Sequence, residues 1–233
     1  MPRKARLIIA NSPHHILQRG HNRQIVFRDD EDFEFYANNI RSLKLVHKLK
    51  LYAYCLMPNH IHIIVDPVNE VSNISAFMKS LAIRQTRFFN SKYSRSGTLW
   101  ESRYISSPVE AERYLLACCR YVEMNPVRSK RVNQPMEYLW SSYGERFSTY
   151  SWIDQCPCFN ELDTSVDSPI EAYKIYMMTE ANENETKFIQ SAMCKGKIIG
   201  DASFIEKLSS KYGFKLSRRS PGRPRKIIAN AMS

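Results

Sequence analysis

The sequence lacks any hydrophobic run of the length that crosses a membrane. Its longest apolar stretches, such as residues 61–65, are short, whereas a transmembrane helix needs about 20 apolar residues. The first six residues are basic, but only Leu7–Ala10 follow as an apolar segment, and a secretory signal requires a longer one. We therefore expect a cytoplasmic protein.

Cysteine pairs with metal-binding spacing are also missing. The six cysteines are Cys55, Cys118, Cys119, Cys156, Cys158 and Cys194. None of them forms a C-x-x-C pair, and two are adjacent in the sequence. This pattern argues against a zinc ribbon, a zinc-binding regulator and a disulfide framework. Reduced thiols in a reducing compartment fit it better.

Acidic residues are few, with 23 Asp and Glu against 34 Lys and Arg, and the net charge is +11. The excess is uneven: basic and acidic residues number 22 and 13 in residues 1–150, 2 and 8 in 151–187, and 8 and 1 in 205–226. A basic body and a basic tail indicate a polyanionic partner. Charge alone does not identify that partner, because many basic proteins bind no nucleic acid specifically.

Hydrophobic periodicity predicts an α+β fold. Strands are expected at residues 14–19, 49–56, 60–65 and 104–105, and helices after the N-cap Asp29-Asp30, over 75–93 and from about 107 to 124. This order is the split βαβ pattern of a ferredoxin-like domain with an antiparallel sheet. A mostly helical or disordered C-terminal extension follows, with a weak helix at 202–212.

The last helix of the core has clear start and stop signals. Ser107-Pro108-Val109-Glu110 supplies a capping serine, a proline for the first helical position and a glutamate three residues after the serine. Pro126 disfavours helical backbone at the residue before it. We therefore place one domain at residues 1–150, an acidic linker or small helical extension at 151–204, and a basic tail at 205–233.

His60-Ile61-His62 lies on a predicted strand. Because side chains alternate along a strand, both imidazoles point to one face and Ile61 points to the other. Two histidines at this spacing can chelate one metal ion. A pair of surface or hydrogen-bonded histidines is the competing interpretation.

Tyr121 and Asn125 are four residues apart near the end of a predicted helix and share one face. A tyrosine hydroxyl, with a pKa near ~10, is a poor nucleophile at neutral pH and needs a metal that polarises the phosphate. The amide oxygen of Asn125 is a ligand of the kind that Mg²⁺ or Mn²⁺ accepts. A common tyrosine beside a helix stop is the alternative. Together with the two histidines, however, the pair forms a minimal set for phosphoryl transfer to protein.

Five segments resemble, in order, the signature blocks of the single-tyrosine HUH transposases, and most of all those of the REP-associated tyrosine transposases. The segments are QRGHNRQIVF (18–27), YCLMPNHIHIIV (54–65), GTLWESRY (97–104), RYVEMNPVR (120–128) and YLWSSY (138–143). The resemblance covers residues 12–145. Five blocks in the right order are strong support, whereas any one of them would be weak.

The resemblance implies an HUH domain in which His60 and His62 bind Mg²⁺ or Mn²⁺, Asn125 is the third ligand and Tyr121 is the nucleophile. Better-known insertion-sequence relatives have glutamine as the third ligand, so Asn125 fits the REP-associated branch. The implied substrate is single-stranded DNA with hairpins, cut and rejoined through a covalent 5′-phosphotyrosine in transposition or repeat mobilisation. The resemblance also implies a nucleoid-associated protein that acts as a monomer rather than a dimer.

Several other residues are candidates for DNA contact. The indole of Trp100 could stack on an unpaired base and the guanidinium of Arg103 could hold a phosphate; a core tryptophan and an arginine paired with a helix carboxylate are equally good interpretations. Four basic residues flank the tyrosine helix, either as a DNA-binding rim or as a solvated face: Arg120, Arg128, Lys130 and Arg131.

The basic tail contains Pro221-Gly222-Arg223-Pro224-Arg225-Lys226, which resembles an AT-hook. In such a segment Arg223 and Arg225 would enter the narrow minor groove of A·T-rich duplex DNA. A purely electrostatic role is the alternative.

Two other functions remain open. A non-catalytic regulator that binds hairpin DNA could use the same fold for recognition alone. A replication initiator or relaxase-like nuclease shares the histidine and tyrosine chemistry, but such proteins usually place the tyrosine earlier in the chain.

Overall fold

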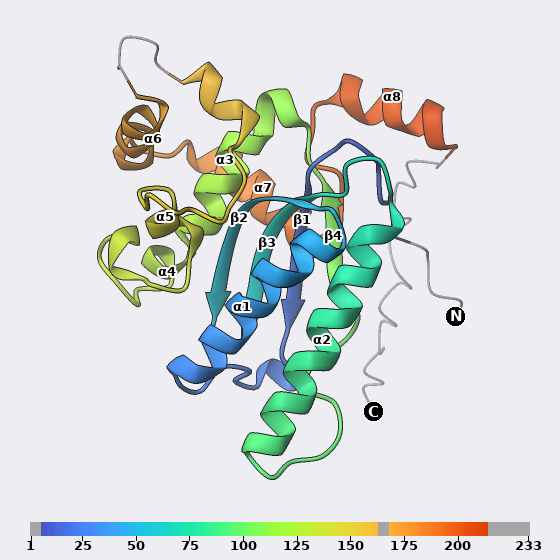
Figure 1. Ribbon diagram of the computed structural model, residues 1–233. Helices are drawn as coiled ribbons and strands as arrows, with labels where there is room; N and C mark the ends of the chain where they lie inside the picture. Colours follow the sequence, from blue (N-terminus) through green and yellow to red (C-terminus); the bar gives the residue numbers. More distant parts are fainter. Residues whose placement is uncertain (1–5, 163–167, 214–233) are drawn as a thin grey trace, which may run out of the picture. The chain divides into compact units, whose positions relative to one another are not determined.

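The computed structural model describes residues 6–162 and 168–213 and divides into two compact units, residues 1–200 and residues 201–233 (Figure 1). The strands are β1 (His14–Arg19), β2 (Lys50–Met57), β3 (His60–Asp66) and β4 (Ile105–Pro108). The helices of the first unit are α1 (Asp30–Val46), α2 (Ser72–Lys92), α3 (Ala111–Glu123), α4 (Asn125–Arg128), α5 (Ser142–Glu145), α6 (Pro169–Met178) and α7 (Glu183–Lys195). Short 3-10 helices are η1 (His21–Arg23), η2 (Pro135–Glu137) and η3 (Pro157–Glu161).

The described part of the second unit is the helix α8 (Ala202–Tyr212), in which the side chain of the N-cap residue Asp201 accepts a hydrogen bond from the backbone of Phe204. The two units meet at residues 200 and 201. The domain boundaries that the sequence suggests, after residues 150 and 204, stay a prediction. Across both described ranges, no helix combines the length and the apolar character needed to span a bilayer.

The four strands form one sheet in the order β2-β3-β1-β4, and all neighbouring strands are antiparallel. Strand β3 lies between β1 and β2, because α1 carries the chain across the sheet before the β2-β3 hairpin turns back. The order is that of the split βαβ pattern. The predicted ferredoxin-like α+β fold is therefore confirmed.

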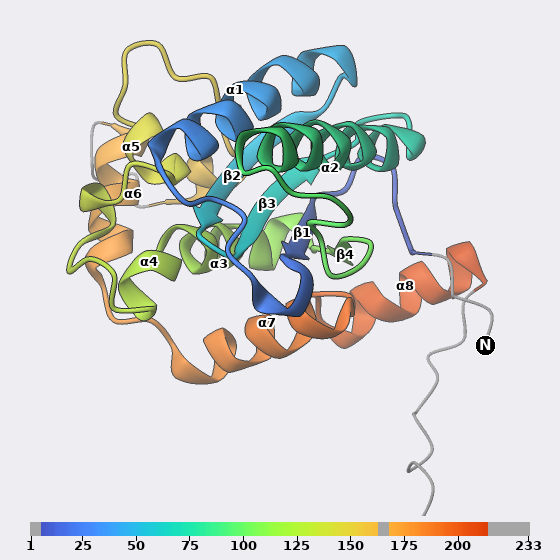
Figure 2. The ribbon, with the colours of Figure 1, turned by 90° about the horizontal axis from the view of Figure 1, so that it is seen from below.

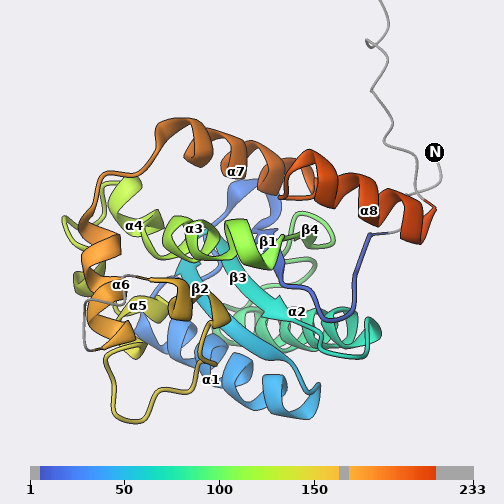
Figure 3. The same ribbon diagram turned by 90° about the horizontal axis from the view of Figure 1, so that it is seen from above.

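Helices cover both faces of this sheet, with α1 and α2 on one side and α3 and α7 on the other (Figures 2 and 3). Along β3, Ile61, Ile63 and Val65 pack in the core beneath α1 and α2. Ile64 packs in the second core, with α3. Because side chains alternate along a strand, His60 and His62 point to the α3 side as well.

The helix that carries Tyr121 begins later than its start signals predict. Ser107 and Pro108 belong to strand β4, where they pair with His15 and His14 of β1, and α3 begins at Ala111. The predicted capping role of Ser107 and Pro108 is therefore wrong, because strand pairing takes these residues first. A proline is tolerated there because β4 lies at the edge of the sheet. The predicted stop before Pro126 is confirmed, and Pro126 lies in the first turn of the short helix α4.

The outer edge of β2 is bound by the segment that follows α4. Leu56 donates its backbone N–H to the carbonyl of Trp140. Ser142 Oγ accepts from the N–H of Tyr54 and donates to its carbonyl oxygen. Farther along, Leu51 donates to a carboxylate oxygen of Asp154 and accepts from its backbone N–H. The free side of this edge strand is thus hydrogen-bonded within the chain.

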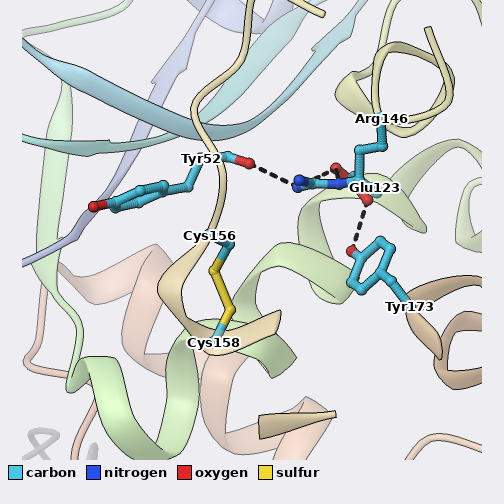
Figure 4. The surroundings of a disulfide bond; sticks show 6 residues. All are labelled: Tyr52, Glu123, Arg146, Cys156, Cys158 and Tyr173. Atoms are coloured by element: carbon cyan, nitrogen blue, oxygen red, sulfur yellow. Dashed lines mark hydrogen bonds and ion pairs between the residues drawn. A yellow bond between two sulfur atoms is a disulfide. The ribbon is translucent and has the colours of Figure 1, made fainter. Parts of the chain in front are cut away.

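The prediction that all cysteines are reduced is wrong for two of them. Cys156 and Cys158 form a disulfide (Figure 4). The single residue between them leaves their Cα atoms 5.3 Å apart, which is within the range that a disulfide spans. Cys55, Cys118 and Cys119 are free and buried, and Cys194 is free and exposed.

A buried ion pair joins α3 to the elements around it (Figure 4). Glu123, on α3, accepts hydrogen bonds from Arg146 at 2.8 Å and from the hydroxyl of Tyr173 on α6 at 2.7 Å. Arg146 also donates to the backbone carbonyl of Tyr52 on β2. These contacts connect the tyrosine helix to the sheet and to the C-terminal helices, two residues after Tyr121.

Candidate active site

The two histidines of β3 each use one ring nitrogen within the protein. Their ring centroids lie 5.0 Å apart. Nδ1 of His60 donates to the side-chain oxygen of Asn59 at 2.7 Å, and Nδ1 of His62 lies 2.8 Å from Nε2 of His15. Throughout the described residues, neither Nε2 has a hydrogen-bond partner. Metal-binding histidines typically show this arrangement, with one nitrogen held by a neighbour and the other left for the ion.

Burial keeps these imidazoles neutral near pH 7. Together with smaller contributions from the nearby guanidiniums of Arg19 and Arg131, it lowers the pKa of His60 to about 4. Burial also lowers the pKa of His62 well below its usual value, with the neighbouring His15 contributing. A neutral imidazole offers the lone pair that a metal ion requires.

Tyr121 faces the two histidines from α3. Its ring centroid lies 6.1 Å from that of His62, and the residue is 8% exposed. The guanidinium carbon of Arg128 lies 3.8 Å from the centre of the tyrosine ring. Burial raises the pKa of the Tyr121 hydroxyl, while the charge of Arg128 opposes this rise. The phenol therefore stays protonated at neutral pH and lies beside a cation that stabilises negative charge.

Asn125 is the first residue of α4, one helical turn after Tyr121, and it is 9% exposed. Its backbone carbonyl accepts from the N–H of Ser129, and its side-chain amide has no hydrogen-bond partner within the described ranges. Residues 6–162 and 168–213 contain no group of three or more His, Cys, Asp or Glu that could hold a metal. A third protein ligand beside the two histidines would therefore be a residue of another type, such as Asn125 with its amide oxygen, whose role stays a prediction.

Comparison with known proteins identifies the family of the chain. A sequence model of the family described as "Transposase IS200 like" matches residues 9–125. The chain belongs to the IS200-like transposase family. This membership places the chain among the DNA transposases. None of the curated proteins matches the chain.

One solved structure supports the fold of this IS200-like transposase. A REP-associated tyrosine transposase bound to a REP hairpin is similar with a TM-score of 0.51 and 15% identity, over 67% of this chain and 93% of that one. A candidate transposase from Deinococcus radiodurans R1 has a TM-score of 0.35 and 21% identity, over 50% of this chain and 91% of that one. Because the first structure is only 15% identical, its similarity supports the fold alone. The TM-score of the second structure is too low to support any conclusion.

The other DNA-contact candidates of this IS200-like transposase lie in different environments. Trp100 is 6% exposed in the core with α1 and α2, which favours packing over base stacking. Arg103 is exposed and forms no ion pair with any described carboxylate. Arg120 is buried and donates to the carbonyl oxygens of Met177 and Thr179, so its guanidinium is engaged within the chain.

Arg128, Lys130 and Arg131 are exposed and follow α3 as predicted, and their contact with DNA stays a prediction. Arg223 and Arg225 of the AT-hook-like segment lie outside the described residues.

Sequence reasoning missed two residues at this site. Arg19 lies directly opposite His60 across the β1-β3 pair, so its side chain lies on the same face of the sheet. His15 contacts His62 through a ring nitrogen, and spacing within either strand alone does not predict this contact. The signal for both is the register between β1 and β3, which local periodicity does not provide.

Proposed function

We propose that the protein is a metal-dependent single-stranded DNA endonuclease and strand transferase that acts through a covalent 5′-phosphotyrosine on Tyr121. The observation that carries this proposal is the position of Tyr121, 6.1 Å from His62 between ring centroids and on the same side of the sheet as both strand histidines. A tyrosine beside two neutral imidazoles with free Nε2 atoms fits phosphoryl transfer to protein better than recognition alone.

The residues present fit a divalent ion. His60 and His62 would hold Mg²⁺ or Mn²⁺ through Nε2, and Asn125 would supply an oxygen. A bound ion would polarise the scissile phosphate and offset the charge that develops on it. The support for this assignment is that both Nδ1 atoms have partners, in Asn59 and in His15.

In the proposed reaction, the phenolic oxygen of Tyr121 forms a bond to phosphorus and the bond between phosphorus and the 3′ oxygen of DNA breaks. The phenol loses its proton to solvent, and the departing 3′ oxygen takes up a proton to become a hydroxyl. Arg128 stabilises the developing phenolate, because its guanidinium lies over the ring. Arg19, opposite His60, adds positive charge for the phosphate.

The second half of the reaction reverses the first. The phosphotyrosine retains a phosphodiester linkage, so a DNA 3′ hydroxyl can attack it and release Tyr121 without an external energy source. This reversal would join the 5′ end to a new strand, which is the strand transfer that transposition or repeat mobilisation requires.

The proposed substrate is single-stranded DNA with a hairpin. The similar REP-associated transposase was solved with a REP hairpin, and residues 1–150 of this chain carry 22 basic against 13 acidic residues. Such an excess favours a polyanion. Binding of the tail to A·T-rich duplex DNA, and action as a monomer, are further parts of the proposal.

A covalent-adduct assay tests this function. End-labelled single-stranded DNA with hairpin repeats is incubated with the protein and Mg²⁺ or Mn²⁺, then separated on denaturing gels. We expect a labelled protein band that requires metal, disappears in Tyr121→Phe and persists in the control Tyr150→Phe, because Tyr150 is 87% exposed and outside the site. Hairpin binding without any adduct would favour the non-catalytic regulator instead.

A further inference from the structure

A cavity of about 310 Å³ opens beside Tyr121. It lies between α3 and the connection from α6 to α7, and its walls include Tyr121, Arg128, Tyr176, Met178, Glu185 and Thr186. The family match ends at residue 125, so much of this wall comes from a part of the chain that the family match does not cover. The C-terminal helices therefore add a site of their own next to the reactive hydroxyl.

Arg120 holds this wall against the tyrosine helix. Its guanidinium lies 4.9 Å from the ring centre of Tyr176 and donates to the backbone carbonyls of Met177 and Thr179 at the end of α6. Because Arg120 immediately precedes Tyr121, the connection between α6 and α7 is fixed relative to the reactive side chain. The cavity is thus built into the packing of α3, α6 and α7.

The lining suits a flat heterocycle with polar edges. Tyr176 and Met178 offer an aromatic ring and a thioether, on which a nucleobase can pack. The volume lies at the lower end of the range for small-molecule pockets. Arg128, over Tyr121, places positive charge on the same wall, where the phosphate of a bound nucleotide would lie.

Glu185 brings a carboxylate to the cavity. It lines the cavity and is half-buried, and no described cation forms an ion pair with its carboxylate. A carboxylate accepts hydrogen bonds but donates none when ionised, so it matches a base that carries an exocyclic amino group. Cytosine, adenine and guanine carry one, and thymine does not.

We infer that this cavity binds the base of the nucleotide next to the scissile phosphate, and that Glu185 selects an amino-bearing base over thymine. The inference rests on the proposed function, because the base is placed by its attachment to the phosphate that Tyr121 attacks. The C-terminal helices would then help to choose the cleavage site.

Binding of mononucleotides tests the cavity without any cleavage. Ligand-observed NMR titrations of the full chain with dCMP, dAMP, dGMP and TMP should give dissociation constants roughly tenfold lower for the three amino-bearing nucleotides than for TMP. Glu185→Ala should remove this difference. The matched control Glu183→Ala should keep it, because Glu183 is exposed on the same helix and pairs with Lys187.

Cleavage preference provides the second readout. In the adduct assay with DNA randomised around the cut site, the native protein should disfavour thymine at one flanking position, and Glu185→Ala should accept all four bases there. Normal adducts with no base preference, or a preference that survives in Glu185→Ala, would overturn the inference and leave the proposed function intact. Nucleotide selectivity that depends on Glu185 in a protein that forms no adduct would support the cavity and count against the nucleophile.

Discussion

Nε2 of His15 lies 2.8 Å from Nδ1 of His62. One of these nitrogens must donate to the other, and the choice fixes which nitrogen of His62 carries the proton. If Nδ1 of His62 donates, its Nε2 presents a lone pair toward the site; the opposite choice protonates Nε2 and blocks a metal. His15, at the start of the sheet, is therefore a positioning residue for His62.

Replacing His15 should weaken metal binding. We expect His15→Phe, which fills similar space without an acceptor, to reduce Mn²⁺ affinity by roughly 10- to 100-fold, as loss of such partners does in other metal sites. Electron paramagnetic resonance of free Mn²⁺ measures this directly. His47→Phe, at the end of α1 and beside Phe77, is the control. An unchanged affinity in a folded His15→Phe protein would remove His15 from the site.

The free energy of unfolding should decrease as the pH is lowered, because β1 contains two buried histidines. Burial lowers the pKa of His14 to about 4 and that of His15 to about 3, below the value in an unfolded chain. The unfolded state therefore binds more protons below about pH 6.5, and folding loses free energy as the pH falls. Between pH 6.5 and 5 the loss should be roughly 2 kcal/mol for each histidine.

Urea denaturation at pH 7 and pH 5 measures this loss. His15→Phe should show a smaller difference in unfolding free energy between the two pH values than the native protein. Equal pH dependence of the two proteins would mean that His15 is not held neutral in the folded state.

Glu123→Ala should destabilise the fold strongly. The mutation leaves the buried guanidinium of Arg146 without its charge partner and the hydroxyl of Tyr173 without an acceptor. Removing one member of a buried pair costs about 3–5 kcal/mol. Glu112→Ala, exposed on the same helix, should change stability little. Thermal and chemical denaturation of both variants would show the contrast, and equal stabilities would contradict the buried pairing.

Arg128→Met should slow the covalent step. Without the guanidinium over its ring, the pKa of Tyr121 should rise further, because burial already raises it and Arg128 is the group that opposes this. We expect single-turnover adduct formation to slow by roughly 10²-fold, the effect of removing one stabilising donor in other enzymes. Lys79→Met, at an exposed lysine of α2 on the other side of the sheet, is the control. Hairpin affinity that falls as much as the rate would indicate a binding role instead.

Local sequence pattern predicts most of the helices and strands. It does not predict the contacts that depend on how the strands pair in the sheet. Alternation along residues 60–65 correctly places both histidines of β3 on one face, away from the core of Ile61. Ser107 shows a helix signal, yet pairing with β1 takes precedence over it. Arg19 and His15 reach the site only through strands 40 or more residues apart in sequence. Such long-range pairings are tertiary contacts, which periodicity within one segment cannot show.

The covered edge of β2 has a consequence for assembly. An exposed edge strand is a template onto which another chain can add a strand, as in sheet-extended dimers and in aggregation. Here Leu51, Tyr54 and Leu56 already direct their outer backbone groups to Asp154, Ser142 and Trp140. A second copy could add a strand at the β2 edge only by displacing residues 140–154, so this edge is protected from sheet extension.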